Sequence, residues 1–116
     1  MCPPGVTGPP AIDRFDVAQR ALAFSALAGT LPPPPQPHRE LGENLQRATA
    51  ALRTSIERAA GRRDAAFSYG VARGAAVQAT THIECYRCLR VIEPRQYEAA
   101  MALLRPLVAT LTRLAR

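Results

Sequence analysis

The chain of 116 residues contains no tryptophan and no lysine, and aromatic residues make up only 5% of it. Hydrophobic residues nevertheless account for 47%, so alanine and leucine must fill most of the core. This composition favours closely packed helices over β-sheets. The length allows one domain, whose core is large enough to fold without disulfides or a metal ion.

Long apolar runs are also absent, since none reaches the roughly 20 residues that a membrane-spanning helix needs. The first residues are rich in proline and glycine and lack the basic start and apolar stretch of a secretory signal. We therefore expect a cytoplasmic protein that makes no membrane contact, with a disordered tail over residues 1–12 and one helical domain over 13–116. Three cysteines, Cys2, Cys85 and Cys88, cannot all pair within one chain, so we expect free thiols.

The charge of the chain is strongly one-sided. All 15 basic residues are arginine, against nine acidic residues, which gives a net charge of +6 and a sequence pI near 10.2. Such an excess indicates an acidic partner. A solvated arginine surface accounts for it equally well, and the sequence leaves both interpretations open.

The spacing of apolar residues predicts a first helix over 13–28, with Asp13 as its N-cap. Four residues at helical spacing predict its apolar face: Phe15, Ala18, Leu22 and Ala26. Gly29 ends this helix, and the following LPPPPQPH is too rich in proline to be helical. We expect an extended, polyproline-like link that acts as a spacer; a proline-rich ligand for another protein is the alternative.

The second helix is predicted over 38–60. Alternating steps of four and three residues form a heptad seam of Leu41, Leu45, Ala48, Leu52, Ser55 and Ala59. Arg47 and Arg53 fall on the opposite face and Arg58 on the flank. The sequence GRRD then supplies a turn, with Asp64 as the next N-cap.

The third helix is predicted over 64–91 and should be the longest. Its seam comprises Val71, Ala75, Gln78, His82, Cys85 and Leu89. Gln78 and His82 lie one turn apart in that seam, which predicts a buried polar layer. A strip of small residues, Ala66, Gly70 and Gly74, predicts a close contact with another helix or subunit.

Glu93 and Pro94 predict the start of a fourth helix, since proline suits the first turn. We expect Pro106 to kink this helix by freeing the carbonyl of Ala102. Glu98, Arg105 and Thr112 mark the face of this helix that is expected to be exposed to solvent. Two adjoining apolar seams comprise Ala100, Leu104, Leu107, Leu111 and Leu114, widened by Tyr97, Met101 and Val108.

Four amphipathic segments joined by short connections predict an all-α, antiparallel up-down-up-down four-helix bundle. The apolar face of the fourth helix is broader than one bundle can cover. We therefore expect a homo-oligomer.

Four strings in order resemble the bacterial four-helix bundle family first noticed in intervening sequences of large-subunit ribosomal RNA genes, over residues 13–115. They are VAQRA, LQRATAALRTSIERAAGR, ARGAAVQ and EPRQYEAAMALLRPLVATLTRL. Within the second string the matching residues are Leu45, Arg47, Ala48, Ile56, Gly61 and Arg62, whereas Ser55, Arg58 and Ala59 differ. The resemblance implies a non-enzymatic bundle, commonly a ring of five subunits. Its relatives include the accessory variability protein of diversity-generating retroelements, which binds reverse transcriptase and nucleic acid.

The sequence offers no nucleophile with a base and an orienting acid, no paired carboxylates and no phosphate loop, so we expect neither catalysis nor a cofactor. His82, Cys85 and Cys88 have steps of three residues that resemble metal ligands. A metal-binding C-x-x-C normally lies in a turn, however, and here it falls inside a helix. We expect packing roles: small buried cysteines beside a hydrogen-bonded core histidine.

Arginine is the remaining functional candidate, because its planar fork pairs with phosphates. The candidates for nucleic-acid binding concentrate around the second helix, the turn and the early third helix: Arg47, Arg53, Arg58, Arg62, Arg63 and Arg73. Few aromatic residues accompany them, so we expect sequence-independent contacts with the RNA or DNA backbone. The predicted function is an oligomeric, nucleic-acid-associated accessory or scaffold protein. The alternative is an adaptor that recruits a protein partner.

Overall fold

The computed structural model describes residues 11–60 and 64–116, and over these ranges the chain is helical with no β-strand. The all-α class is therefore confirmed. The elements are α1 (Ala11–Ala28), the short 3-10 helix η1 (Gln36–His38), α2 (Arg39–Ala59), α3 (Ala65–Cys88) and α4 (Pro94–Leu114). Among the described helices α3 is the longest, with 24 residues, as predicted.

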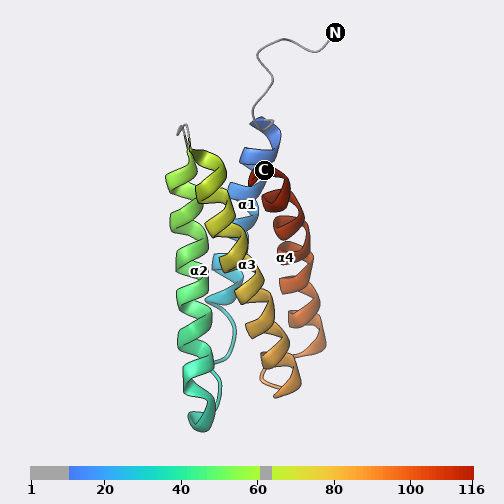
Figure 1. Ribbon diagram of the computed structural model, residues 1–116. Coiled ribbons are helices and arrows are strands. Elements are labelled where there is room, and N and C mark those ends of the chain that lie inside the picture. Colours follow the sequence, from blue (N-terminus) through green and yellow to red (C-terminus); the bar gives the residue numbers. More distant parts are fainter. Residues whose placement is uncertain (1–10, 61–63) are drawn as a thin grey trace, which may run out of the picture.

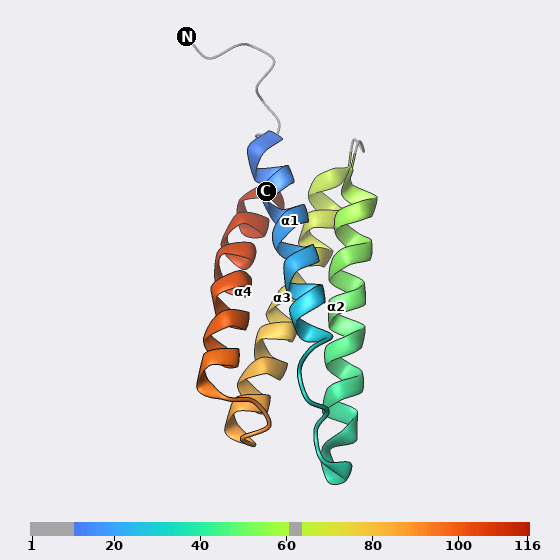
Figure 2. The same cartoon turned by 180° about the vertical axis from the view of Figure 1, so that it is seen from behind.

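The four α-helices lie side by side (Figure 1). Within the described residues α1 contacts α2 and α4 but not α3, and α2 contacts α3 but not α4. Helices α1 and α3 therefore lie at opposite corners of the four helices of one chain, as do α2 and α4. Figures 1 and 2 show the same relation, since α3 lies in front of α1 in one view and behind it in the other. This arrangement is compatible with a four-helix bundle.

The predicted seams of α2 and α4 form much of the core. In α2 the seam from Leu45 to Ala59 is buried, and Leu41 at its start is half-buried. In α4 every residue of the main seam is buried: Ala100, Leu104, Leu107, Leu111 and Leu114. Both helices carry several charged residues on the other side, and these mark unambiguously which face meets water.

The predicted face of α1 is wrong. Val17, Ala21 and Phe24 are buried, whereas Phe15 is 65% exposed and Leu22 is 53% exposed. Helix α1 has apolar residues on two sides, so its periodicity fits two different faces. Packing selects the side on which Ala21 allows a close approach and Phe24 fills the interior.

The predicted seam of α3 is wrong for a similar reason. Ala75 is buried, but Val71, Gln78 and Leu89 are exposed. The inner positions are taken mainly by alanines together with Tyr69, Ile83 and Tyr86, while Phe67 and Val77 stay exposed, because small residues let the neighbouring helices approach closely. The buried residues of this helix are Ser68, Tyr69, Ala72, Ala75, Ala76, Ala79, Ile83 and Tyr86.

Two helix starts test the predicted caps. Asp13 is not an N-cap, since α1 begins two residues earlier; it lies in the first turn and pairs with Arg113 of α4 at 3.6 Å. Glu93 does cap α4, and its backbone N–H donates to the side chain of Gln96 at 2.7 Å, which completes a capping box. Helix α4 continues through Pro106 to Leu114.

The connections follow the sequence closely. Gly29 follows the last residue of α1, and Pro35 has the extended conformation expected of a polyproline-like link. Asp64 occupies the N-cap position of α3, although its side chain makes no capping hydrogen bond. Of the predicted disordered tail, residues 1–10 lie outside the described ranges and the last two belong to α1. None of the described helices is long and apolar enough to cross a membrane.

Arg90, just after α3, adopts a left-handed conformation with φ of 59°. It stands where glycine is usual, since the amide of Val91 donates to the carbonyl of Tyr86 at 2.9 Å and closes the helix end. Replacing Arg90 with glycine should raise the free energy of unfolding by about 0.5–1 kcal/mol, because glycine tolerates this conformation. Arg105→Gly removes the same charge from a helix interior and should lower it by about 1 kcal/mol. Urea denaturation followed by circular dichroism measures both changes in the free energy of unfolding. Two changes of the same sign would contradict the left-handed conformation of Arg90.

Candidate nucleic-acid interface

Two of the predicted arginines share one face of α2. Arg47 and Arg58 are exposed and stand 11 residues apart, which is close to three full helical turns. Arg47 Nη1 donates to Asn44 Oδ1 at 2.9 Å, a local contact that leaves its other N–H groups free. This outer face of α2 points away from the core.

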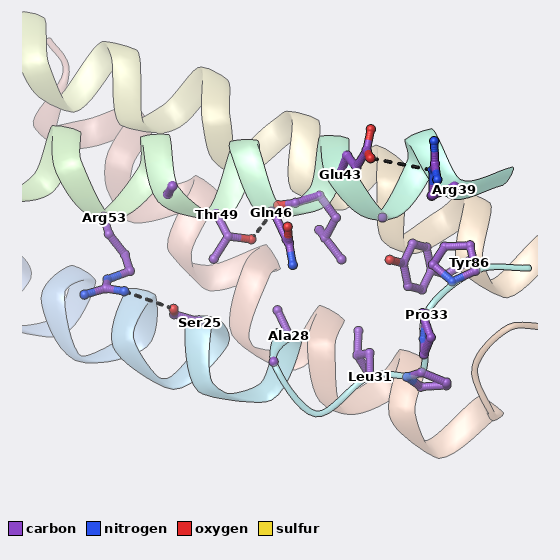
Figure 3. A pocket seen from close by; sticks show the side chains of 16 residues that line it. Ser25, Ala28, Leu31, Pro33, Arg39, Glu43, Gln46, Thr49, Arg53 and Tyr86 are labelled. Carbon is purple, nitrogen blue, oxygen red and sulfur yellow. Dashed lines mark hydrogen bonds and ion pairs between the residues drawn. The ribbon is translucent and has the colours of Figure 1, made fainter. Parts of the chain in front are cut away.

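Arg53 lies on a different side of α2. Its Nη1 donates to Ser25 Oγ of α1 at 3.5 Å, so the side chain bridges the edge between α1 and α2 (Figure 3). The sequence pattern placed it with Arg47 because both lie opposite the seam. The structure separates the two.

Arg73 is also separated from the α2 pair. Its Nε donates to Thr112 Oγ1 of α4 at 2.8 Å, which places it at the edge between α3 and α4. Arg62 and Arg63 lie outside the described residues. Of the six predicted residues, the structure therefore groups Arg47 with Arg58.

Many acidic residues are already paired. Arg20 pairs with Asp16 at 2.9 Å, and other ion pairs join Arg39–Glu43, Arg87–Glu84, Arg95–Glu93 and Arg113–Asp13. Among the described residues no carboxylate lies within 4.0 Å of the guanidinium of Arg47, Arg53, Arg58 or Arg73. These four guanidinium groups have no direct ion-pair partner in the described chain, so a phosphate could bind them by displacing the solvent ions around them.

The predicted polar layer and buried cysteines are wrong. Gln78 is exposed, His82 and Cys85 are half-buried, and Cys88 is exposed. Burial lowers the pKa of His82, because a partly desolvated imidazole disfavours its charged form. No group of three His, Cys, Asp or Glu side chains in the described ranges is arranged to hold a metal ion.

Two outer faces without charge were not predicted from the sequence. On α3 the exposed residues between Ala65 and Ile83 include a single charge, Arg73 at the α4 edge. The rest are apolar, small or neutral: Phe67, Gly70, Val71, Gly74, Val77, Gln78 and Thr81. On α1 the equivalent outer stripe comprises Ile12, Phe15, Gln19, Leu22 and Ala26. We call these the α3 face and the α1 face.

Two residues of the small-residue strip, Gly70 and Gly74, belong to the α3 face, whereas Ala66 is half-buried. A Cβ built at Gly74 would meet no atom within 4 Å in the described structure, and one built at Gly70 would approach only Ala115 at 3.9 Å. The two glycines therefore do not serve close packing between the helices of the described chain. A subunit contact, the other half of the prediction, stays a prediction.

The chain matches no protein-family model and no curated protein sequence. The resemblance to the bacterial four-helix bundle family therefore stays a prediction. Over the described residues the fold and the surface define an all-α protein with four α-helices, two largely uncharged outer faces and an exposed side of α2 on which Arg47 and Arg58 lie near Glu40 and Glu57.

Proposed function

We propose that this chain is an antiparallel four-helix bundle that assembles with copies of itself into a non-enzymatic, nucleic-acid-associated scaffold in the cytoplasm. One observation carries the assembly: the two uncharged faces lie on α1 and α3, helices at opposite corners. Exposed apolar faces of this kind are typical of subunit interfaces. In this proposal the α1 face of one copy packs against the α3 face of the next, a heterologous contact that gives a ring when the rotation between copies closes and an open filament when it does not.

Assembly through these faces would leave the outer face of α2 in contact with solvent. Arg47 and Arg58 would then be repeated on every subunit, three helical turns apart and with no carboxylate partner among the described residues. A repeated array of free guanidinium groups suits the phosphates of RNA or DNA and releases their counterions. The expected contact is with the backbone and is independent of base sequence.

A protein-recruiting adaptor is the second candidate, because the same uncharged faces fit an apolar partner surface. Salt distinguishes the two functions. Phosphate contacts weaken steeply as salt rises, whereas an apolar contact changes little.

The test measures binding of a generic RNA and a generic DNA duplex by fluorescence anisotropy over a range of salt concentrations. Replacing Arg47 and Arg58 together with glutamine should lower the affinity, and the slope of log K against log salt should fall by about one for each phosphate that is no longer bound. A matched control replaces Arg20 and Arg113, which have the same charge but already pair with Asp16 and Asp13.

The control variant should keep the slope of the unmodified chain. Equally weakened binding in both double variants would show that net charge alone governs binding. Absence of binding at low salt would overturn the nucleic-acid role and leave the adaptor function.

A further inference from the structure

A groove of about 450 Å³ lies between the end of α1, the proline-rich link and one side of α2 (Figure 3). Its size lies within the range of small-molecule sites. Much of its wall is apolar, with Ala28 and Leu31 on one side and prolines of the link at one end. Polar groups reach it at separate points along its length.

The link itself explains why the groove stays open. Prolines have a restricted φ and no N–H, so this segment keeps an extended course and does not coil into the space. The link passes close to α2 at Gly42, where an added Cβ would lie 3.0 Å from Pro34 Cδ. Glycine at this position lets the link close one end of the groove against the helix.

Tyr86 of α3 supplies an unpartnered polar group at that end. The residue is only 3% exposed, and its hydroxyl lies 3.5 Å from the same Cβ position at Gly42. Among the described residues this hydroxyl has no hydrogen-bond partner, and in Figure 3 it points into the groove. Burial raises the pKa of Tyr86, so the hydroxyl stays protonated at neutral pH and remains able to donate. No buried side-chain nitrogen or oxygen of the described residues lacks a partner, so this hydroxyl is open to the groove, where the oxygen of a ligand can accept its hydrogen bond.

Arg53 supplies a cation towards the other end. Its contact with Ser25 Oγ is long, at 3.5 Å, and no carboxylate in the described chain lies within 4.0 Å of it. Arg39 and Glu43, which also line the groove, pair with each other at 3.8 Å. The groove therefore has an uncompensated positive charge, and its preferred ligand is an anion.

The distance between the two polar points sets the ligand's length. Gly42, beside the Tyr86 hydroxyl, and Arg53 stand 11 residues apart on α2, which is roughly 16 Å along the helix axis. The arginine side chain covers part of that distance. A molecule that reaches both groups is elongated, and its middle section lies between Ala28 and Leu31 on one side and Gln46 and Thr49 of α2 on the other.

We infer that this groove binds a linear amphipathic carboxylate, with its carboxylate on Arg53, its apolar chain along Ala28 and Leu31, and an oxygen at its far end hydrogen-bonded to Tyr86. The inference is independent of the nucleic-acid role, because Arg47 and Arg58 lie outside the groove. It also gives Arg53 a role that differs from phosphate binding.

The test uses isothermal titration calorimetry of the full chain with three probes: ω-hydroxydecanoate, decanoate and decanediol. The hydroxy acid should bind most tightly. Arg53→Gln should weaken its binding by about tenfold or more, since a hydrogen-bonded charge pair is removed. Arg47→Gln removes the same charge outside the groove and should change the affinity less than about twofold.

Tyr86→Phe keeps the buried ring and removes the hydroxyl. It should abolish the preference for the hydroxy acid over decanoate, a decrease of about fivefold, while binding of decanoate itself is unchanged. Circular dichroism of each variant shows whether the helices persist. Equal affinity for decanediol and the hydroxy acid, equal weakening in the two arginine variants, or no saturable binding at millimolar concentration would each overturn the inference.

Discussion

Replacing Phe24 with alanine is expected to lower the free energy of unfolding by about 3–5 kcal/mol, whereas the same change at Phe15 should cost less than about 0.5 kcal/mol in the monomer. Phe24 is fully buried, and its removal leaves a cavity that neighbouring helices fill only in part. Phe15 is 65% exposed, so removing its ring takes little apolar surface out of the core. The two substitutions are chemically identical and lie on the same helix.

Urea denaturation at low protein concentration, followed by circular dichroism, measures both values. Low concentration matters because Phe15 belongs to the α1 face, which we propose packs against another copy. A large decrease for Phe15→Ala and a small one for Phe24→Ala would mean that α1 presents its other side to the core.

Introducing glutamate into either uncharged face is expected to convert the assembly into monomers. Leu22→Glu alters the α1 face and Phe67→Glu alters the α3 face, where Phe67 is 73% exposed. A carboxylate buried without a partner in a subunit contact should weaken it by more than about a hundredfold. Light scattering after size exclusion measures the mass of each variant.

A mixture of the two variants tests whether the contact is heterologous. Leu22→Glu keeps an intact α3 face and Phe67→Glu keeps an intact α1 face, so one contact can form and an equimolar mixture should give dimers. Ala51→Glu, on the exposed side of α2, is the control and should leave the assembly unchanged. If either variant alone forms dimers, like faces pair with like; a monomeric unmodified chain would overturn the proposed assembly.

The sequence predicted the inward faces of α2 and α4 because charged residues mark their outward faces. Arg47, Glu98 and Arg105 can only face water, and once they are placed the remaining apolar residues form a single stripe. Helix α3 has only Arg73 as such a marker between Ala65 and Ile83, and the charged residues of α1 all lie in its first ten positions. Their apolar and small residues are spread around the helix, and spacing alone fits more than one face.

The residues of the candidate sites, too, were predicted from the sequence only in part. Arginine density along the chain drew attention to α2, and Arg47 and Arg58 do share a face there. Arg53 differs from these two arginines because its neighbours belong to α1 and to the link, which are distant from it in the sequence. The groove gave no sequence signal, since Tyr86 reaches it from α3, 44 residues beyond Gly42.

Three properties of this protein follow from the order of its residues: the all-α class, the helix ends to within a few residues, and the excess of arginine on the surface. Helix propensity, proline and glycine breaks and charge are local properties, so they can be read one segment at a time. The inward sides of α1 and α3, the direction of Arg53 and the groove beneath the link become visible only in the folded chain. These features depend on how large and small side chains from different helices fit together, and close packing of that kind is a property of the whole fold.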